Sequence, residues 1–312
     1  MKQRIQEIEN QLTAFSNKRY AKEEILPELL LLQKQMAAVA FNVSLEETKG
    51  LRLVNVSKRL EQLNVDCGSI ANETVDEFIA GSKAITHLIK AEVSGVKGEK
   101  QAYKSLQTIR RKHRIIKNVE LRHEHHIAEI DMVVVVNNAV FLIEVKNSMR
   151  DILIDEKGNY LRYKYDRDLS FDKNIGQKMN EKEYLLREVL KNAGYEDVVM
   201  QSLVVFTNNS ISVENNYEYI KTCFLSDLPH IINNYVDGEY YGSEQMQGIV
   251  DAIMSAKSKV TYRTDDVDFP AIKRNFATLI ATLEEAKTKR SKKHNFFNIW
   301  NRLARVACFM FN

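Results

Sequence analysis

The sequence predicts an α/β protein in which a mixed β-sheet core is flanked by helices, with an all-helical N-terminal region and a helical C-terminal tail. Two observations predict this class. Apolar residues recur at helical spacing near the N-terminus, and short apolar runs typical of strands alternate with a helical segment in the middle of the chain. We therefore expect a helical region over residues 1–93, a sheet-based core over 94–226 and a second helical region over 227–312.

The composition excludes several classes of protein. Of the 312 residues 44% are hydrophobic, and 45 basic against 42 acidic residues give a net charge of +3, which excludes an intrinsically disordered chain. The three cysteines, Cys67, Cys223 and Cys308, lie far apart, so we expect no disulfide framework and a reducing compartment. The N-terminus lacks the apolar segment of a signal peptide, and no apolar run could cross a membrane. These features predict a cytoplasmic protein.

The N-terminal region is expected to be helical because its apolar residues lie three and four positions apart. The first such face consists of Ile5, Ile8, Leu12 and Phe15. Further helices are expected at 25–36, 45–63 and 75–89. These faces favour a helical bundle or a dimerising coiled coil, so we expect a homo-oligomer or a protein partner at this end.

The character of the sequence changes near Gly95, where a helical stretch through Leu106 gives way to short apolar runs. These runs predict the following elements: strands at 115–121, 129–136 and 139–146, a hairpin-like piece at 151–164 that turns at Lys157-Gly158-Asn159, a helix at 175–190, and strands at 198–207 and 219–225. The chain beyond Asp227 is expected to be helical again.

The C-terminal tail, residues 287–312, combines a basic cluster with an aromatic amphipathic helix. This combination is compatible with peripheral contact to an anionic membrane surface. The same apolar face could instead dock on the body of the protein or on a second subunit.

Residues 129–147, EIDMVVVVNNAVFLIEVKN, predict a central β-hairpin. The pair Asn137-Asn138 suits a two-residue turn that needs positive φ. With that turn, Asp131 lies opposite Glu144 on one face, with Cβ atoms roughly 5 Å apart. Lys146 points to the same side as Glu144, because side chains alternate along a strand.

Two facing carboxylates at the end of an apolar strand pair repel each other and lose solvation. A cation, a shared proton or a basic partner can compensate, and carboxylate oxygens suit Mg²⁺ or Mn²⁺. Lys146 could hold or activate a water beside a phosphate, or stabilise charge on the transferring group. The alternative is an exposed strand end with ordinary salt bridges from Lys146 to Glu144 or Glu129.

The arrangement resembles the PD-(D/E)XK nuclease superfamily, and more closely its nuclease-related domain family, NERD. Three elements in order carry the resemblance: Gly98-Glu99, Glu129-Ile130-Asp131 and Glu144-Val145-Lys146-Asn147. The family places a β extension where residues 151–164 lie, and an Asn-Pro and a Gln before its next helix. Here Asn174-Ile175-Gly176-Gln177 is similar but lacks the proline, which leaves the role of Gln177 open.

The resemblance implies a metal-dependent nuclease that hydrolyses phosphodiester bonds, with DNA favoured over RNA. Asp131 and Glu144 would bind the metal, Glu99 would complete its shell or orient a water, and Lys146 would assist hydrolysis. A role in DNA processing or in defence against foreign DNA follows from the resemblance alone. Two rival classes remain: a nucleic-acid-binding module that does not cleave, and a membrane-peripheral scaffold that uses its C-terminal helix.

Two further groups of residues invite a function. His123, His125 and His126 suggest zinc, but no second ligand pair follows at a suitable spacing, so we expect a polar loop. Basic residues in the run 110–114, and again between Arg162 and Arg167 among tyrosines that include Tyr160, would suit a surface that tracks a nucleic-acid backbone.

Overall fold

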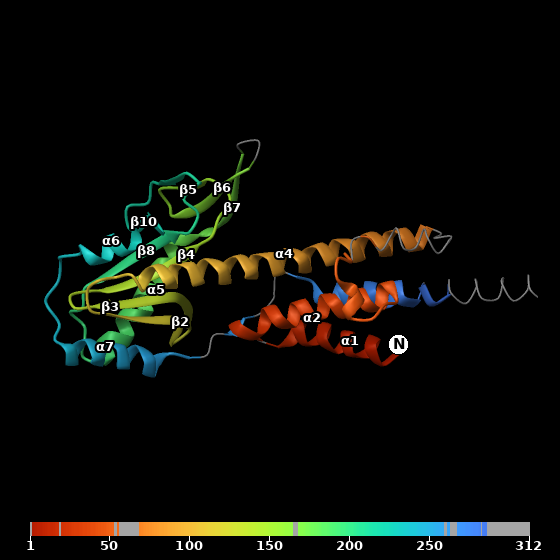
Figure 1. The fold of residues 1–312 in the computed structure, drawn as a ribbon, viewed down its shortest axis with the longest axis horizontal. Helices are drawn as coiled ribbons and strands as arrows, with labels where there is room; N and C mark the ends of the chain where they lie inside the picture. The colour runs from red at the N-terminus through yellow and green to blue at the C-terminus, as the bar shows by residue number, and fades with distance from the viewer. Residues whose placement is uncertain are drawn as a thin grey trace, which may run out of the picture. The chain divides into compact units, whose positions relative to one another are not determined.

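The computed structural model describes residues 2–18, 20–52, 55, 69–164, 168–258, 261–262, 267–281 and 283–285. The chain forms two compact units. One unit takes residues from both ends of the chain, 1–91 and 261–312, and the other consists of residues 92–260. The mixed α/β class that the sequence predicts is confirmed (Figure 1).

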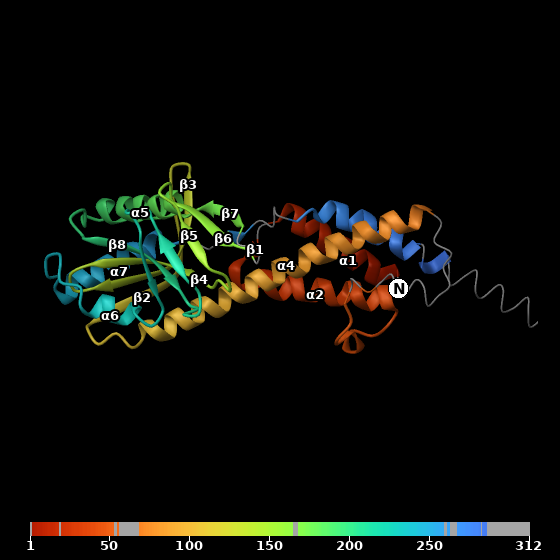
Figure 2. The ribbon, with the colours of Figure 1, turned by 90° about the horizontal axis from the view of Figure 1, so that it is seen from above.

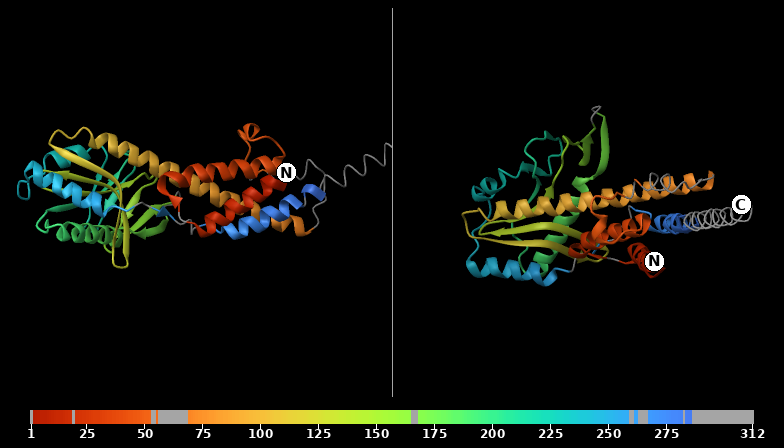
Figure 3. Two further views of the ribbon diagram at one scale, coloured as in Figure 1. Left: turned by 90° about the horizontal axis from the view of Figure 1, so that it is seen from below. Right: turned by 45° about the vertical axis from the view of Figure 1, so that its right-hand side comes forward.

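The first unit is a bundle of helices that lie side by side (Figure 3). Its helices are α1 (Lys2–Asn17), α2 (Lys22–Phe41), the first part of α4 (Ser69–Leu106) and residues 269–281, with a short 3-10 helix, η1 (Glu46–Thr48). A two-stranded sheet, β1 (Tyr20–Ala21) with β11 (Thr261–Tyr262), accompanies them. The apolar face of α1 is buried inside this bundle, with Leu12 fully enclosed beside Leu29 and Phe276. That face is therefore used within the chain and is not free for self-association.

Helix α4 continues through Gly95 and Gly98 and joins the helix expected at 75–89 to the helical stretch expected through Leu106. An interior glycine costs a helix about 1 kcal/mol, which neighbouring turns and packing can offset. Gly98 also allows a close approach, because a Cβ there would lie 3.1 Å from the Cβ of Asn147. The helix therefore carries Glu99 past the end of the sheet-forming hairpin.

The second unit is built on a five-stranded mixed sheet in the order β10-β8-β4-β3-β2 (Figure 1; Figure 2 gives the view from above). Its strands are β2 (His113–His123), β3 (His126–Val136), β4 (Val140–Lys146), β8 (Met200–Phe206) and β10 (Lys221–Phe224). β2, β3 and β4 pair antiparallel, whereas β8 lies parallel to both β4 and β10. All five correspond to predicted strands.

Both faces of this sheet are buried, as the apolar β3–β4 sequence predicts. Helices α5 (Ile175–Asn192) and α7 (Ser243–Ala256) share one core with the first face, and the end of α4 and α6 (Leu228–Asn233) share another core with the second face. The first core includes Val133, Val135, Leu142, Met179, Leu186 and Ile249. The second core includes Leu106, Val134, Phe141, Ile143 and Ile232.

A smaller four-stranded sheet, in the order β7-β6-β5-β9, follows the hairpin. Its strands are β5 (Ile152–Ile154), β6 (Asn159–Tyr163), β7 (Leu169–Asn174) and β9 (Val213–Asn215), of which β7 and β9 are not predicted from the sequence. The β5–β6 turn needs glycine at Gly158, where φ is +76° and a Cβ would lie 2.8 Å from the Cα of Gly176.

The segments beyond Asp227 divide between the two units. Ile253 of α7 packs in the core of the second unit, whereas Phe269 packs with α1 and α2 in the first. The units therefore do not coincide with the three consecutive segments expected from the sequence. The basic cluster and amphipathic helix of residues 287–312 lie outside the described residues. Among the helices that are described, none is both long and apolar enough to traverse a membrane.

Candidate active site

The β3–β4 hairpin has the register that the sequence predicts. Met132 pairs with Ile143 at the open end of the ladder. One position further, the same register sets Asp131 opposite Glu144, on the side of the hairpin that faces the core beneath α5. Two carboxylates are thus brought together from neighbouring central strands.

The turn of this hairpin has the predicted length but not the predicted backbone conformation. The Val136 N–H donates to the Ala139 carbonyl at 2.9 Å, which confirms a two-residue loop. Neither Asn137 nor Asn138 has positive φ, so the prediction of a left-handed turn is wrong. The guanidinium of Arg111 instead bonds the side-chain oxygens of both residues, at 2.6 Å for Asn138. The asparagines serve as hydrogen-bond partners of a half-buried arginine.

Asp131 is fixed by the backbone of the neighbouring strand. Its Oδ2 accepts a hydrogen bond from the Val145 N–H at 2.7 Å. The bond joins β3 to β4 beyond their last paired residues and orients the carboxylate beside Glu144. A carboxylate at this position therefore belongs to the local fold as well as to the candidate site.

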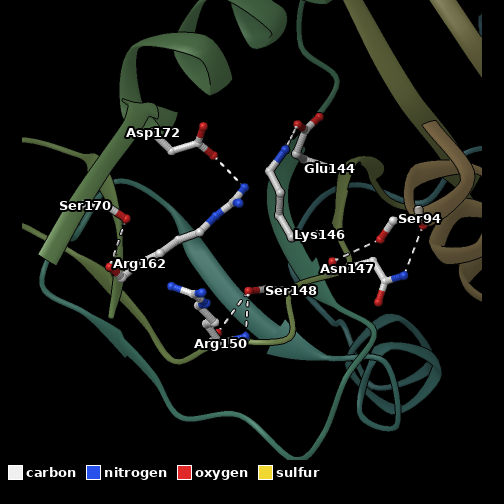
Figure 4. Close-up of polar contacts among 9 residues, drawn as sticks. All are labelled: Ser94, Glu144, Lys146, Asn147, Ser148, Arg150, Arg162, Ser170 and Asp172. Atoms are coloured by element: carbon white, nitrogen blue, oxygen red, sulfur yellow. Dashed lines mark hydrogen bonds and ion pairs between the residues drawn. The ribbon is translucent and has the colours of Figure 1, made fainter. Parts of the chain in front are cut away.

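Both oxygens of the Glu144 carboxylate form ion pairs with lysines. Lys146, two residues further along β4, bonds Oε1 (Figure 4), and Lys182 from α5 bonds Oε2. Glu144 is 7% exposed and Lys182 is 8% exposed. The salt bridge from Lys146 to Glu144 that the sequence left open is therefore present, but it lies in the interior and not at an exposed strand end.

The charges of this cluster shift one another's pKa values. Burial alone would raise the pKa of Glu144, but the ammonium groups of Lys146 and Lys182 outweigh it and hold that pKa below its ordinary value. Burial alone would lower the pKa of Lys146, but the carboxylates of Glu144 and Asp131 raise it. Burial and then the nearby Lys146 lower the pKa of Lys173 to about 8. The cluster therefore holds opposite charges in close, mutually dependent pairs.

Two lysines of this cluster, Lys173 and Lys182, were missed from the sequence. Lys182 had a usable signal, because it stands three residues after Met179 and four before Leu186 on the apolar side of α5. A lysine on a buried helix face requires a carboxylate partner. Lys173 gave no such signal, because β7 itself was not predicted.

The other two predicted site residues, Glu99 and Gln177, are not part of the cluster around Glu144. Glu99 follows Gly98, whose Cα approaches the end of β4. No three His, Cys, Asp or Glu side chains among the described residues are grouped to hold a metal, so Glu99 forms no such set with Asp131 and Glu144. The Gln177 N–H donates to Oδ1 of Asn174 at 2.6 Å and its side chain is exposed. Its backbone thus serves the helix N-cap.

The comparison with protein families finds a match for the segment that carries this cluster. Residues 94–207 match the nuclease-related domain, NERD. The resemblance stated from the sequence is thereby confirmed, over a segment that contains Asp131, Glu144 and Lys146. No curated protein and no solved structure shows significant similarity to the chain.

The residues of this cluster are of the kind that binds a divalent metal. Asp131 and Glu144 supply carboxylate oxygens, which suit Mg²⁺ and Mn²⁺, and Mg²⁺ commonly takes only one or two carboxylates from a protein and the rest of its shell from water and phosphate. The two ammonium groups on Glu144 show that this buried carboxylate requires positive charge beside it.

The surface near the cluster carries polar groups from the smaller sheet. Arg162 of β6 forms an ion pair with Asp172 of β7 at 2.8 Å (Figure 4). Tyr160 is only 1% exposed, so it belongs to the core and cannot stack on a base. Tyr165 and Arg167 lie outside the described residues.

The basic run 110–114 is not part of this surface. His113 pairs with Val136, at the turn end of β3, which lies five residues or roughly 17 Å along the strand from Asp131. Within the run, Arg111 is committed to the turn and to the carbonyls of Ile232 and Tyr235 at 3.1 and 2.9 Å. The run therefore stabilises the far end of the hairpin.

The histidines form the other end of the β2–β3 hairpin. His123 pairs with His126, and both rings pack edge-on against Tyr184 of α5. His126 also lies 3.2 Å from a carboxylate oxygen of Glu181. These contacts dock the hairpin tip on α5, as expected of a polar connection between the two strands.

Proposed function

We propose that the NERD unit of this chain is a nuclease that hydrolyses phosphodiester bonds of nucleic acid with a divalent metal, Mg²⁺ or Mn²⁺. The observation that carries the proposal is the placement of Asp131 opposite Glu144 on one buried face, with Lys146 paired to Glu144. It lies inside the segment that matches the nuclease-related domain. DNA is the favoured substrate on the family resemblance, which also suggests DNA processing or defence against foreign DNA.

The residues of the chain divide the chemistry between them. Asp131 and Glu144 would hold the metal, which when bound polarises a phosphate oxygen and makes a water more acidic. Lys146 keeps an ammonium beside the carboxylates, where it would stabilise negative charge that builds up on the phosphate. The low exposure of Glu144 limits solvent around it, so each of these electrostatic effects is stronger than at a surface.

The test is a cleavage assay on linear, circular and single-stranded DNA and on RNA, each with Mg²⁺, Mn²⁺ or EDTA. The informative variants are Glu144→Gln and Lys146→Met, which retain shape and remove charge. The neighbouring exposed residues Glu156 and Lys157 offer matched controls as Glu156→Gln and Lys157→Met. We expect metal-dependent cleavage that falls by about a hundredfold or more in the two site variants and is unchanged in the two controls.

Binding of nucleic acid without cleavage by the wild type would favour the alternative, a module that binds and does not cut. The ion pairs at both oxygens of Glu144 are the observation that supports this alternative. Cleavage that persists in EDTA, or in Glu144→Gln, would contradict the proposed metal chemistry.

A further inference from the structure

The ion pair between Lys182 and Glu144 joins two elements that are far apart in sequence. Lys182 comes from the second turn of α5, and Glu144 lies near the end of β4. The ammonium reaches Oε2 of the carboxylate, the oxygen that Lys146 does not use. Both groups are almost fully buried, so the pair is part of the interior.

A buried carboxylate of this kind can be neutralised in two alternative ways. Removing a charge from water is costly unless an opposite charge compensates, and a lysine ammonium or a metal ion can each do so. A metal must approach a carboxylate along an oxygen lone pair, and ammonium groups now bond both oxygens of Glu144. Each oxygen keeps a second lone pair, but a divalent cation there would lie close to two ammonium groups and be repelled by both, so metal binding at Glu144 favours withdrawal of one lysine.

Lys182 is the lysine with the weaker hold on the site. Lys146 points to the same side of β4 as Glu144, opposite Asp131, and interacts with both carboxylates, so it keeps a carboxylate partner when one oxygen is released. Lys182 has Glu144 as its ion-pair partner. We propose that Lys182 is a resident counter-cation, which occupies Oε2 of Glu144 in the metal-free protein and is displaced when a divalent metal binds. This inference rests on the proposed metal site at Glu144.

The test measures metal affinity directly on the full chain without nucleic acid. Mn²⁺ is titrated into the protein and free Mn²⁺ is followed by electron paramagnetic resonance. The variants are Lys182→Met and Lys182→Gln, which remove the charge with different side chains, and Glu144→Gln. Lys178→Met is the matched control, because Lys178 lies one turn earlier on the same helix and is exposed.

We expect both Lys182 variants to bind Mn²⁺ about tenfold or more tightly than the wild type, because the competing cation is gone. Glu144→Gln should lose binding, and Lys178→Met should match the wild type. Without metal the Lys182 variants should unfold at a lower temperature than the wild type. Mn²⁺ should raise their unfolding temperature by more than it raises that of the wild type.

Unchanged affinity in both Lys182 variants, with binding still lost in Glu144→Gln, would overturn the inference and leave the proposed metal site intact. An equal gain in Lys178→Met would overturn it too, since the effect would then be general charge removal. Absence of Mn²⁺ binding in the wild type and in both Lys182 variants would overturn the inference together with the metal site.

Discussion

The Oδ2 atom of Asp131 accepts a hydrogen bond at 2.7 Å from the backbone N–H of Val145. The bond falls between Glu144 and Lys146 in the sequence, so it fixes the strand segment that presents both residues. This bond needs an acceptor oxygen but no negative charge, whereas metal binding needs the charge. Substitutions can therefore separate the structural and chemical contributions of Asp131.

Asp131→Asn should retain the fold and lose the chemistry. The amide oxygen of asparagine can accept the same hydrogen bond from Val145, so we expect the free energy of unfolding to stay within about 1 kcal/mol of the wild type. Asp131→Ala leaves that N–H without its acceptor and should cost about 1–3 kcal/mol. Urea unfolding measures the stability of both variants, and the DNA cleavage assay measures their activity.

Both Asp131 variants should lose metal-dependent cleavage, because neither carries a negative charge at this position. Full cleavage by Asp131→Asn would show that the charge is dispensable, and Asp131 would then be a structural residue only. Equal stability of the two variants would contradict the structural contribution of the Val145 bond.

Arg111→Lys should weaken the fold without affecting cleavage by the folded protein. A lysine cannot reproduce the forked contacts of Arg111 to Asn138 and to the carbonyls of Ile232 and Tyr235. We expect the free energy of unfolding to fall by about 2–4 kcal/mol. The neighbouring exposed Arg110, as Arg110→Lys, is the control and should change it by less than about 0.5 kcal/mol.

Removal of charge at the exposed Arg110, as Arg110→Gln, tests whether the basic run is a nucleic-acid surface. The run lies at the turn end of β3, away from Asp131, so the affinity of this variant for DNA at a fixed salt concentration should match that of the wild type. A loss of affinity in folded Arg110→Gln would return the run to the binding surface.

The strands, the hairpin register and the nuclease-related family could be predicted because each depends on local sequence. Short apolar runs set the strand limits, and a two-residue loop set Asp131 opposite Glu144. The φ angles of Asn137 and Asn138 were predicted wrongly, because their conformation is set by Arg111 from outside the hairpin. The local preference of asparagine for turns predicted the two-residue loop correctly, but it did not reveal the contacts of Arg111 with both side chains.

The rest depends on contacts between distant segments, which one sequence does not reveal. Lys182 reaches Glu144 only because α5 crosses the face of the sheet, and Lys173 approaches Lys146 only because β7 pairs with β6. β7 contains the polar sequence LSFDKN, so its strand structure comes from pairing and not from its own pattern. Helix α7 likewise belongs to the second unit because it packs on the sheet, and this contact between distant segments cannot be read from its own sequence.

Tyr160 should make stability depend on pH in the alkaline range. Burial raises the pKa of Tyr160 to about 12, above its ordinary value of 10.0. Below about pH 10 both folded and unfolded states keep the proton, and above it the unfolded state loses the proton first, so stability falls between about pH 10 and 12. By pH 11 the loss should be about 1 kcal/mol relative to pH 9.

Tyr160→Phe should remove this part of the pH dependence, measured as the change in the free energy of urea unfolding from pH 9 to 11. Tyr240, which is 81% exposed, offers Tyr240→Phe as the control, and its profile should follow the wild type. Identical slopes for wild type and Tyr160→Phe would contradict the assignment of Tyr160 to the interior.

Cys223 should react slowly with alkylating reagents while the protein is folded. Burial in β10, followed by the nearby Asp227, raises the pKa of the thiol from 9.0 to about 12. The thiolate is the reactive species, so at pH 8 its population is about a thousandfold lower than for a thiol of ordinary pKa. Iodoacetamide should therefore label Cys223 far more slowly in native protein than in urea. Because the chain has three cysteines, labelling is read on the peptide that contains Cys223, with Cys223→Ser as the blank. Equal rates in the native and unfolded protein would show that the fold does not shield this half-buried thiol.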